Sequence, residues 1–156
     1  MPNFKNLSEL ISYVKKQASD VLQNEVAEVV KQNMSETIIE ETYTAYESEA
    51  IEPYERRGLD GGLADTSNMV VERIDDTTII IRNLTPGNDS YSIYTDGPID
   101  RIIVYGTGYQ WDRSKIYRLQ PFPRDFYAGT KARLEKNKNH IIAFKNGLKK
   151  RGLNIK

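Results

Sequence analysis

Cysteine is absent from the 156-residue chain, and histidine occurs once, at His140. The absence of thiols excludes disulfide scaffolds, thiolate nucleophiles, iron–sulfur clusters and cysteine-ligated zinc sites. No apolar run approaches the roughly 20 residues that a membrane-spanning helix needs, so we expect a soluble protein with no membrane partner. The length suits a single domain, and an apolar content of 38% is low but sufficient for one core.

The net charge is zero, but the two signs are unevenly distributed along the chain. Residues 113–156 carry 13 basic side chains against two acidic ones, so the remainder carries nine basic against 20 acidic. Either the two halves pair with each other inside one domain, or the poles lie on different surfaces and each copy meets the next by opposite charge. The sequence leaves both readings open.

Two helices are predicted, one near each end of the chain. Apolar residues at spacings of three and four predict a long amphipathic helix over about residues 7–40, and Asn6 followed by Glu9 resembles a capping box at its start. β-Branched and aromatic residues past about residue 40 leave its end uncertain. A similar apolar pattern, followed by Gly152, predicts a C-terminal helix over about residues 124–150.

The middle of the chain predicts a β-hairpin over about residues 69–84, because two β-branched runs flank Asp75-Asp76, a pair that suits a two-residue turn. Ahead of it, residues 53–68 are rich in glycine and short polar residues, which is typical of a loop. Residues 92–94 suit a further short strand, and the isoleucines of residues 99–103 suit a helical turn as well as a strand.

The order helix, antiparallel strands, helix predicts an α+β fold in a single domain over residues 1–156. In this fold the long N-terminal helix and the C-terminal helix pack on a small antiparallel β-sheet with long loops.

Motifs for catalysis and for cofactor binding are incomplete. The glycines of residues 106–108 lack the third glycine of a dinucleotide fingerprint and the Gly-Lys-Ser/Thr of a phosphate loop. His140 lies among Lys and Asn residues, which predicts a solvated surface histidine rather than a general base. Asp60, Asp65, Asp75 and Asp76 are turn residues without calcium-loop spacing. We therefore expect no catalytic residue, no cofactor, no metal and no enzymatic activity.

Aromatic residues are more informative, since most of the ten tyrosines and the single tryptophan fall in expected loops. Tyrosine joins a large apolar face to a polar tip, so such a cluster suits an interaction surface. Partial burial over the sheet explains it equally well, and both interpretations stay open.

The order of these features resembles the minor tail or tail-completion family of long-tailed bacteriophages and prophages. The resemblance covers nearly the whole chain, although residues 56–65 and 110–119 depart from the usual pattern and suggest a divergent branch. Besides the helices and the hairpin, the motifs that carry it are Tyr54-Glu55-Arg56-Arg57-Gly58, Gly61-Gly62-Leu63-Ala64-Asp65, Tyr105-Gly106-Thr107-Gly108 and Gln120-Pro121-Phe122-Pro123-Arg124.

The resemblance implies a non-enzymatic structural protein of the phage neck, assembled in the host cytoplasm and located in the virion. Its expected partners are copies of itself in a ring of six or twelve, the neighbouring connector or stopper, and the tail terminator or tail tube. Genome DNA would pass through the lumen without specific binding, so we expect the acidic segment to face the lumen more than the basic helix does.

Contacts between subunits and layers are expected on the loops, because loops on a rigid scaffold carry most contacts. The candidate interface residues are Tyr54, Arg56, Arg57, Gly58, Leu63, Tyr105, Thr107, Tyr109, Trp111 and Arg124.

The alternative interpretation is a nucleic-acid-binding accessory protein that uses the basic C-terminal region. It would place Arg118, Arg124, Lys131, Arg133, Lys136 and Lys138 on phosphates.

Overall fold

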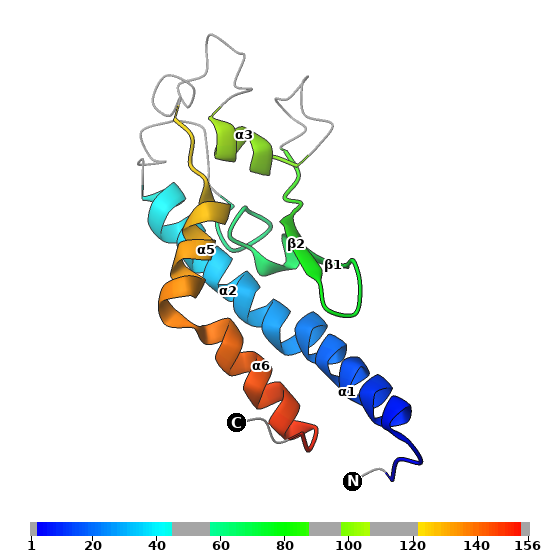
Figure 1. The fold of residues 1–156 in the computed structure, drawn as a ribbon. Helices are drawn as coiled ribbons and strands as arrows, with labels where there is room; N and C mark the ends of the chain where they lie inside the picture. The colour runs from blue at the N-terminus through cyan, green and yellow to red at the C-terminus, as the bar shows by residue number, and fades with distance from the viewer. Residues whose placement is uncertain (1–2, 45–56, 88–97, 107–121, 154–156) are drawn as a thin grey trace.

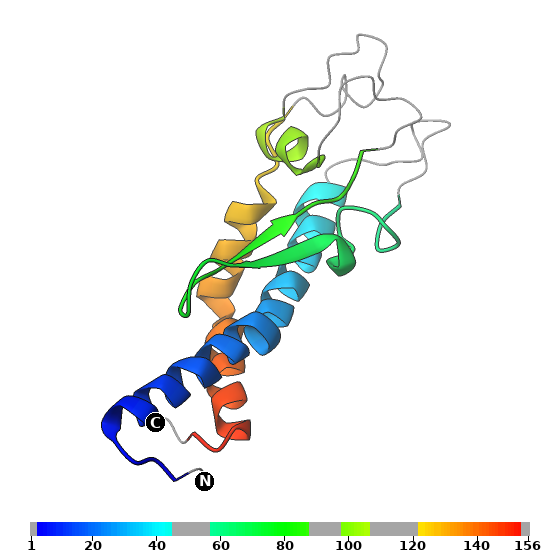
Figure 2. The same ribbon diagram turned by 90° about the vertical axis from the view of Figure 1, so that its right-hand side faces the viewer.

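The computed structural model describes residues 3–44, 57–87, 98–106 and 122–153. Its elements, in chain order, are α1 (Leu7–Val21), a π-helical segment (Leu22–Val26), α2 (Ala27–Thr37), a second π-helical segment (Ile38–Tyr43), a 3-10 turn (Thr66–Asn68), β1 (Met69–Arg73), β2 (Ile79–Asn83), α3 (Asp100–Tyr105), α5 (Phe126–Asn137) and α6 (Asn139–Lys150). The first four follow one another without a break and form one long N-terminal helix. Figures 1 and 2 show α5 and α6 running antiparallel to this helix, with the β-hairpin lying across α2 and α5. The predicted α+β class is therefore confirmed.

The long N-terminal helix begins at the predicted cap. Asn6 Oδ1 accepts the N–H of Glu9 at 2.9 Å, and the Glu9 carboxylate accepts the N–H of Lys5 at 2.9 Å. The helix continues to Tyr43, slightly past the predicted end. Since Ile38 lies fully buried in the core, tertiary packing outweighs the weak helix propensity of this stretch.

The prediction of one C-terminal helix over residues 124–150 is wrong, because the chain breaks at Lys138 into α5 and α6. Lys138 adopts the left-handed conformation, with φ at 56°. Asn137 holds the break, since its Oδ1 accepts the N–H of Asn139 at 3.0 Å and its amide donates to Asn33 Oδ1 at 2.7 Å. This anchor on the long helix replaces the glycine or proline that usually marks a break.

The predicted hairpin is confirmed, whereas its predicted two-residue turn is wrong. β1 and β2 pair antiparallel from Met69 opposite Asn83 to Arg73 opposite Ile79, so residues 74–78 form the connection. The Asp75 carboxylate accepts the N–H of Thr77 at 2.7 Å, a local bond that stabilises the wider turn.

Two hydrophobic clusters hold the fold together. One lies between the long helix, the hairpin and the start of α5, and its buried members are Met34, Ile38, Leu63, Ala64, Met69 and Phe126. The other lies between the long helix and α6, around Val21, Val26 and Leu148. Thus the long helix and the start of α5 pack on the sheet, as predicted, whereas α6 packs chiefly on the long helix.

The first half of α1 departs from the expectation that its whole apolar stripe covers the sheet. Four residues at helical spacing remain partly or largely exposed, namely Leu7 (70%), Leu10 (37%), Ile11 (47%) and Val14 (38%). They lie beyond the end of α6, at the tip of the molecule opposite α3 (Figure 1). None of the helices within the described residues combines the length and the apolarity that crossing a bilayer requires.

The isoleucines near residue 100 belong to a short helix, α3, which settles the choice between helix and strand. The short strand predicted at residues 92–94 lies outside the described residues.

Candidate interaction site

The end of the molecule that carries α3 also carries the bases of three chain segments. The described residues that flank 45–56, 88–97 and 107–121 in the sequence lie at this end (Figure 1), and we call each flanking pair the base of its segment. We call this region the loop-bearing end, after the loops that the sequence predicts here. Each base is closed by contacts between described residues.

The first base is closed by Tyr43, the last residue of the long helix. Its hydroxyl lies 3.4 Å from the carbonyl oxygen of Gly58 and accepts the N–H of Ala64 at 3.0 Å. The glycine-rich loop is packed closely here, because a Cβ at Gly62 would lie 2.4 Å from the same carbonyl oxygen of Gly58. Tyr43 therefore ties the helix end to the point where the chain returns at residue 57.

The second base is closed by backbone pairing across residues 88–97. Pro86 and Pro98 form an antiparallel bridge, and Ile99 N–H donates to the carbonyl oxygen of Thr85 at 3.0 Å. The Arg57 guanidinium donates to the carbonyl oxygen of Pro86 at 2.7 Å, which joins the first base to the second.

The third base is closed at the C-terminal end of α3. Gly106 has φ at +63°, and a Cβ there would lie 2.4 Å from the carbonyl carbon of Phe122. Arg124 N–H donates to the carbonyl oxygen of Ile103 at 2.9 Å, which fixes the returning chain beside the helix. Only glycine fits position 106 without strain, since both its backbone angle and its neighbour exclude a side chain.

A buried polar network lies beneath the first two bases. Asn83, at the end of β2, donates from its side-chain amide to the carbonyl oxygen of Leu63 at 2.7 Å, and its Oδ1 accepts the N–H of Thr85 at 3.1 Å. The Thr85 hydroxyl lies 2.6 Å from that Oδ1 and 3.2 Å from the carbonyl oxygen of Gly62. Asn83 and Thr85 are fully buried and cannot bind water, so these hydrogen bonds satisfy their polar groups.

Tyr127 of α5 joins this network to α3. Its hydroxyl accepts the N–H of Asn83 at 3.0 Å and donates to Asp100 Oδ2 at 3.0 Å. Burial, with the nearby Asp100 carboxylate, raises the pKa of Tyr127 to about 12, so the hydroxyl keeps its proton and its donor role at neutral pH. One side chain thus connects α5, β2 and α3.

Asp65 stabilises the glycine-rich loop that ends at residue 68 by accepting hydrogen bonds from its backbone. Its carboxylate accepts the N–H groups of Gly61 and Ser67, both at 2.8 Å. Hydrogen bonds from Ser67 and Gly61 hold the pKa of Asp65 below its usual range. The predicted turn role of this aspartate is therefore confirmed.

The ten candidate interface residues fall into three groups. Arg57, Gly58 and Tyr105 lie at the loop-bearing end, where Arg57 and Tyr105 are exposed. Leu63 and Arg124 lie there too, but both are buried within the chain, so neither side chain offers contact area. The remaining candidates lie outside the described residues: Tyr54, Arg56, Thr107, Tyr109 and Trp111.

Sequence reasoning did not single out the residues that close and support the bases, namely Tyr43, Asn83, Thr85 and Tyr127. The sequence does contain one signal, because Asn83 and Thr85 are polar residues at the end of an otherwise β-branched run.

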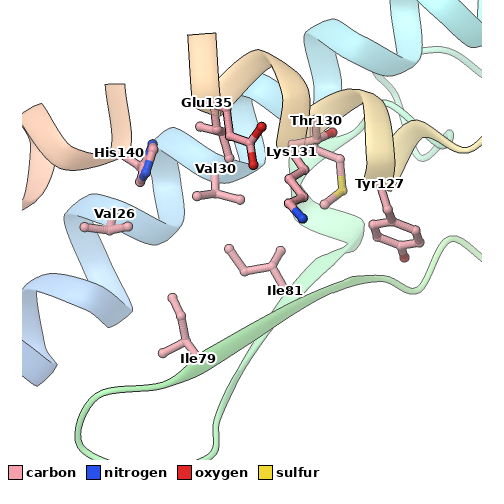
Figure 3. A pocket seen from close by; sticks show the side chains of 11 residues that line it. Val26, Val30, Ile79, Ile81, Tyr127, Thr130, Lys131, Glu135 and His140 are labelled. Atoms are coloured by element: carbon pink, nitrogen blue, oxygen red, sulfur yellow. The ribbon is translucent and has the colours of Figure 1, made fainter. Parts of the chain in front are cut away.

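An open groove of about 430 Å³ lies between the hairpin and the helices. Figure 3 shows Ile79 and Ile81 of β2 directed toward Val26 and Val30 of the long helix. His140 also lines this groove and is half-buried with its Nδ1 shielded from solvent, so the prediction of a solvated surface histidine is wrong. The described residues include no group of three His, Asp or Glu side chains suited to a metal ion.

The basic C-terminal helices pair with the acidic long helix at two places. The Arg133 guanidinium lies 2.6 Å from Glu36 and 2.7 Å from Glu40, and Arg151 lies 2.5 Å from Glu25. The sequence offered two explanations of the charge asymmetry, pairing within the chain and pairing between copies. Pairing within the chain is present among these residues.

Comparisons with known proteins give one result. No curated protein and no solved structure matches the chain. The family model YomN matches residues 6–150, and its name comes from a Bacillus prophage. The match covers nearly all of the described structure, including the long helix, the hairpin and both C-terminal helices. The chain therefore belongs to the YomN family and is related to bacteriophage proteins.

Proposed function

We propose that the chain is a non-enzymatic structural subunit of the phage neck, and that copies of it form a ring that joins the head connector to the tail. The observation that carries the proposal is the loop-bearing end, where three segments have their bases closed side by side on one tip of an elongated fold. Long loops on rigid supports are frequent carriers of intermolecular contacts.

The composition of these segments supports the same function. Residues 45–56, 88–97 and 107–121 contain seven of the eleven Tyr and Trp residues of the chain. Tyr and Trp dominate the binding energy of protein interfaces, because they bury large areas at a low entropic cost. Membership of a phage-related family agrees with a role in the virion.

The proposed partners follow from this role. They are other copies in a ring of six or twelve, a connector or stopper on one side, and a tail terminator or tail tube on the other. DNA passes through the lumen without specific contacts, and the acidic segment faces it more than the basic helices do. The protein would assemble in the host cytoplasm and remain in the virion.

The alternative is a nucleic-acid-binding accessory protein. Two of the basic residues that such a surface needs, Arg133 and Arg151, bind carboxylates of the long helix instead. Exposed cations remain at Lys131, Lys136 and Lys138. DNA binding that falls steeply with salt and is lost when these three lysines are neutralised would favour this alternative.

The neck function is tested by complementing a phage that lacks the gene. We expect unjoined heads and tails without the protein, and complete particles containing it when the wild-type chain is supplied. The variant Arg57→Ala with Tyr105→Ala removes two exposed side chains of the loop-bearing end, and we expect it to fail, because truncating an interface hot spot costs about 2 kcal/mol or more.

Lys145→Ala is the matched control, since this exposed residue lies on α6 away from the loop-bearing end. It should restore particles as well as the wild type does. Complete particles in the absence of the gene, or purified virions without the protein, would overturn the neck function. Normal joining by the Arg57→Ala, Tyr105→Ala chain would overturn only the assignment of the contact end.

A further inference from the structure

The opposite tip of the molecule carries a helix face that the chain itself leaves uncovered. α6 runs antiparallel to the long helix and packs on it as far as Val21, where a Cβ on Gly147 would lie 2.6 Å from Val21 Cγ1. Toward the N-terminus the same face of α1 continues without a covering helix. We call its four exposed residues the α1 stripe: Leu7, Leu10, Ile11 and Val14.

The part of the long helix that α5 and α6 cover is opposite in charge to those two helices. Residues 18–43 carry six acidic side chains and one basic one, whereas residues 126–151 of α5 and α6 carry eight basic and one acidic. The two sides meet through an apolar centre with Arg133 and Arg151 bound to carboxylates at its edges. An acidic helix is therefore covered by basic ones.

The charge is reversed where the helix is uncovered. Residues 3–17 carry three basic side chains, Lys5, Lys15 and Lys16, and one acidic one, Glu9. At 100° per residue Lys15 lies next to Ile11, at the edge of the α1 stripe. Within the described ranges neither Lys15 nor Lys16 forms an ion pair.

We propose that the α1 stripe, with Lys15 at its edge, forms a docking site for an acidic amphipathic helix of a partner protein. Such a helix would continue the line of α6, with its apolar residues on the stripe and its carboxylates beside Lys15. An exposed apolar face bordered by charge of one sign is typical of a protein-binding surface.

Charge also argues against the two occupants that the chain could supply from its described helices. A second α1 lying antiparallel on the stripe would bring no carboxylate to Lys15, because Glu9, the acidic residue of this stretch, lies on the opposite face of the helix. A second α6 would add Lys145 and Lys149 to a surface that already carries Lys15. The first arrangement leaves Lys15 unpaired, and the second places like charges together, which costs free energy.

This proposal does not depend on the neck function, because the α1 stripe and the loop-bearing end lie at opposite tips of the fold (Figure 1). A chain that fails one test can pass the other.

The test uses the full chain and two designed peptides of about three heptads each. Both carry Leu and Ile at the core positions; one carries Glu at the flanking positions and its twin carries Lys. We expect wild-type protein to bind the Glu peptide at least about tenfold more tightly than the Lys peptide in a titration followed by fluorescence anisotropy.

Three variants locate the site. Leu10→Ser with Ile11→Ser should weaken binding of the Glu peptide at least about tenfold, and Lys15→Glu should abolish the preference for the Glu peptide. Val70→Ser with Ile80→Ser is the matched control, since these residues are about as exposed on the outer face of the hairpin, and it should bind like the wild type. All of these positions are exposed, and circular dichroism would verify that each variant keeps its helices.

Equal binding of the two peptides, no binding of either, or unchanged binding by the Leu10, Ile11 variant would overturn the proposal. So would binding to vesicles of anionic lipid without binding to the Glu peptide, which would assign the surface to a membrane. A doubled mass by light scattering that the Leu10, Ile11 variant loses would assign it to a second copy.

Discussion

Individual polar side chains determine the local geometry of the loop-bearing end. Tyr127 is the clearest example, since a single hydroxyl satisfies the N–H of Asn83 and the carboxylate of Asp100. A group that connects three elements is hard to replace, because its loss leaves both partners unsatisfied in a half-buried position. Asn83 supports the adjacent loop in the same way.

We predict that Tyr127→Phe lowers the free energy of unfolding by about 1–3 kcal/mol, because it removes both hydrogen bonds while keeping the ring. Urea denaturation followed by circular dichroism measures the change. Tyr13→Phe is the control, since the Tyr13 hydroxyl forms no hydrogen bond to the described residues, and its effect should stay within about 0.5 kcal/mol. Equal effects of the two substitutions would contradict this role of the hydroxyl.

The raised pKa of Tyr127 adds a pH signature to the same comparison. The pKa rises from an ordinary 10.0 to about 12 in the folded chain, so the folded state holds its proton more tightly. The stabilisation is complete below pH 10 and is lost as the pH rises toward 12. Wild type should therefore lose more stability than Tyr127→Phe over this range.

At the scale of elements, the break between α5 and α6 shows how a tertiary contact overrides a local pattern. Residues 126–150 carry a continuous helical pattern, yet Lys138 takes a left-handed angle that normally favours glycine. The hydrogen bond from Asn137 to Asn33 of the long helix anchors the chain there. The break directs α6 along the long helix, against Val21 and Val26.

We predict that Lys138→Gly raises the free energy of unfolding by about 0.5–1 kcal/mol, because glycine adopts positive φ without strain. Lys145→Gly is the matched control: it replaces another exposed lysine, inside α6, and should lower the free energy of unfolding by about 1 kcal/mol. Both are measured by thermal denaturation at neutral pH. A destabilising Lys138→Gly would show that the left-handed angle costs the wild-type chain nothing.

At the scale of the whole molecule, opposite charges hold the two ends of the sequence together. Glu25 and Arg151 are 126 positions apart and lie 2.5 Å from each other beside the second hydrophobic cluster. The hydrogen bond from Arg151 lowers the pKa of Glu25, and burial opposes it only in part. Nearer the hairpin, Arg133 also joins α5 to the long helix, through ion pairs with Glu36 and Glu40.

The Glu25–Arg151 pair predicts an acid dependence of stability. Because the folded pKa of Glu25 lies below its unfolded value of 4.5, the stabilisation is present above pH 4.5 and is lost as the pH falls through the lower folded value. Urea titrations at neutral and at acid pH should show a smaller acid loss for Glu25→Gln than for wild type, by up to about 1 kcal/mol. Glu28→Gln is the control, since its carboxylate is largely exposed and, among the described residues, pairs only with Lys31. Identical acid losses in the wild-type and Glu25→Gln chains would contradict the role of the pair.

Several elements can be predicted from the sequence because the information for them is local. The helix from Asn6 onward, the hairpin around Asp75 and the turn role of Asp65 follow from cap, alternation and turn chemistry within a few residues. The α+β class follows from the order of these elements, and the absence of cysteine excludes the same classes of site in any fold.

Which parts of these elements are covered depends on the tertiary structure. It broke the C-terminal helix at Lys138, brought Tyr127 to Asn83, and left the first half of the apolar stripe of α1 without a covering helix. It also brought the bases of three segments to one tip of the molecule. The physical reason is that these features depend on contacts between residues far apart in the chain, which periodicity and propensity, as properties of neighbouring residues, do not contain.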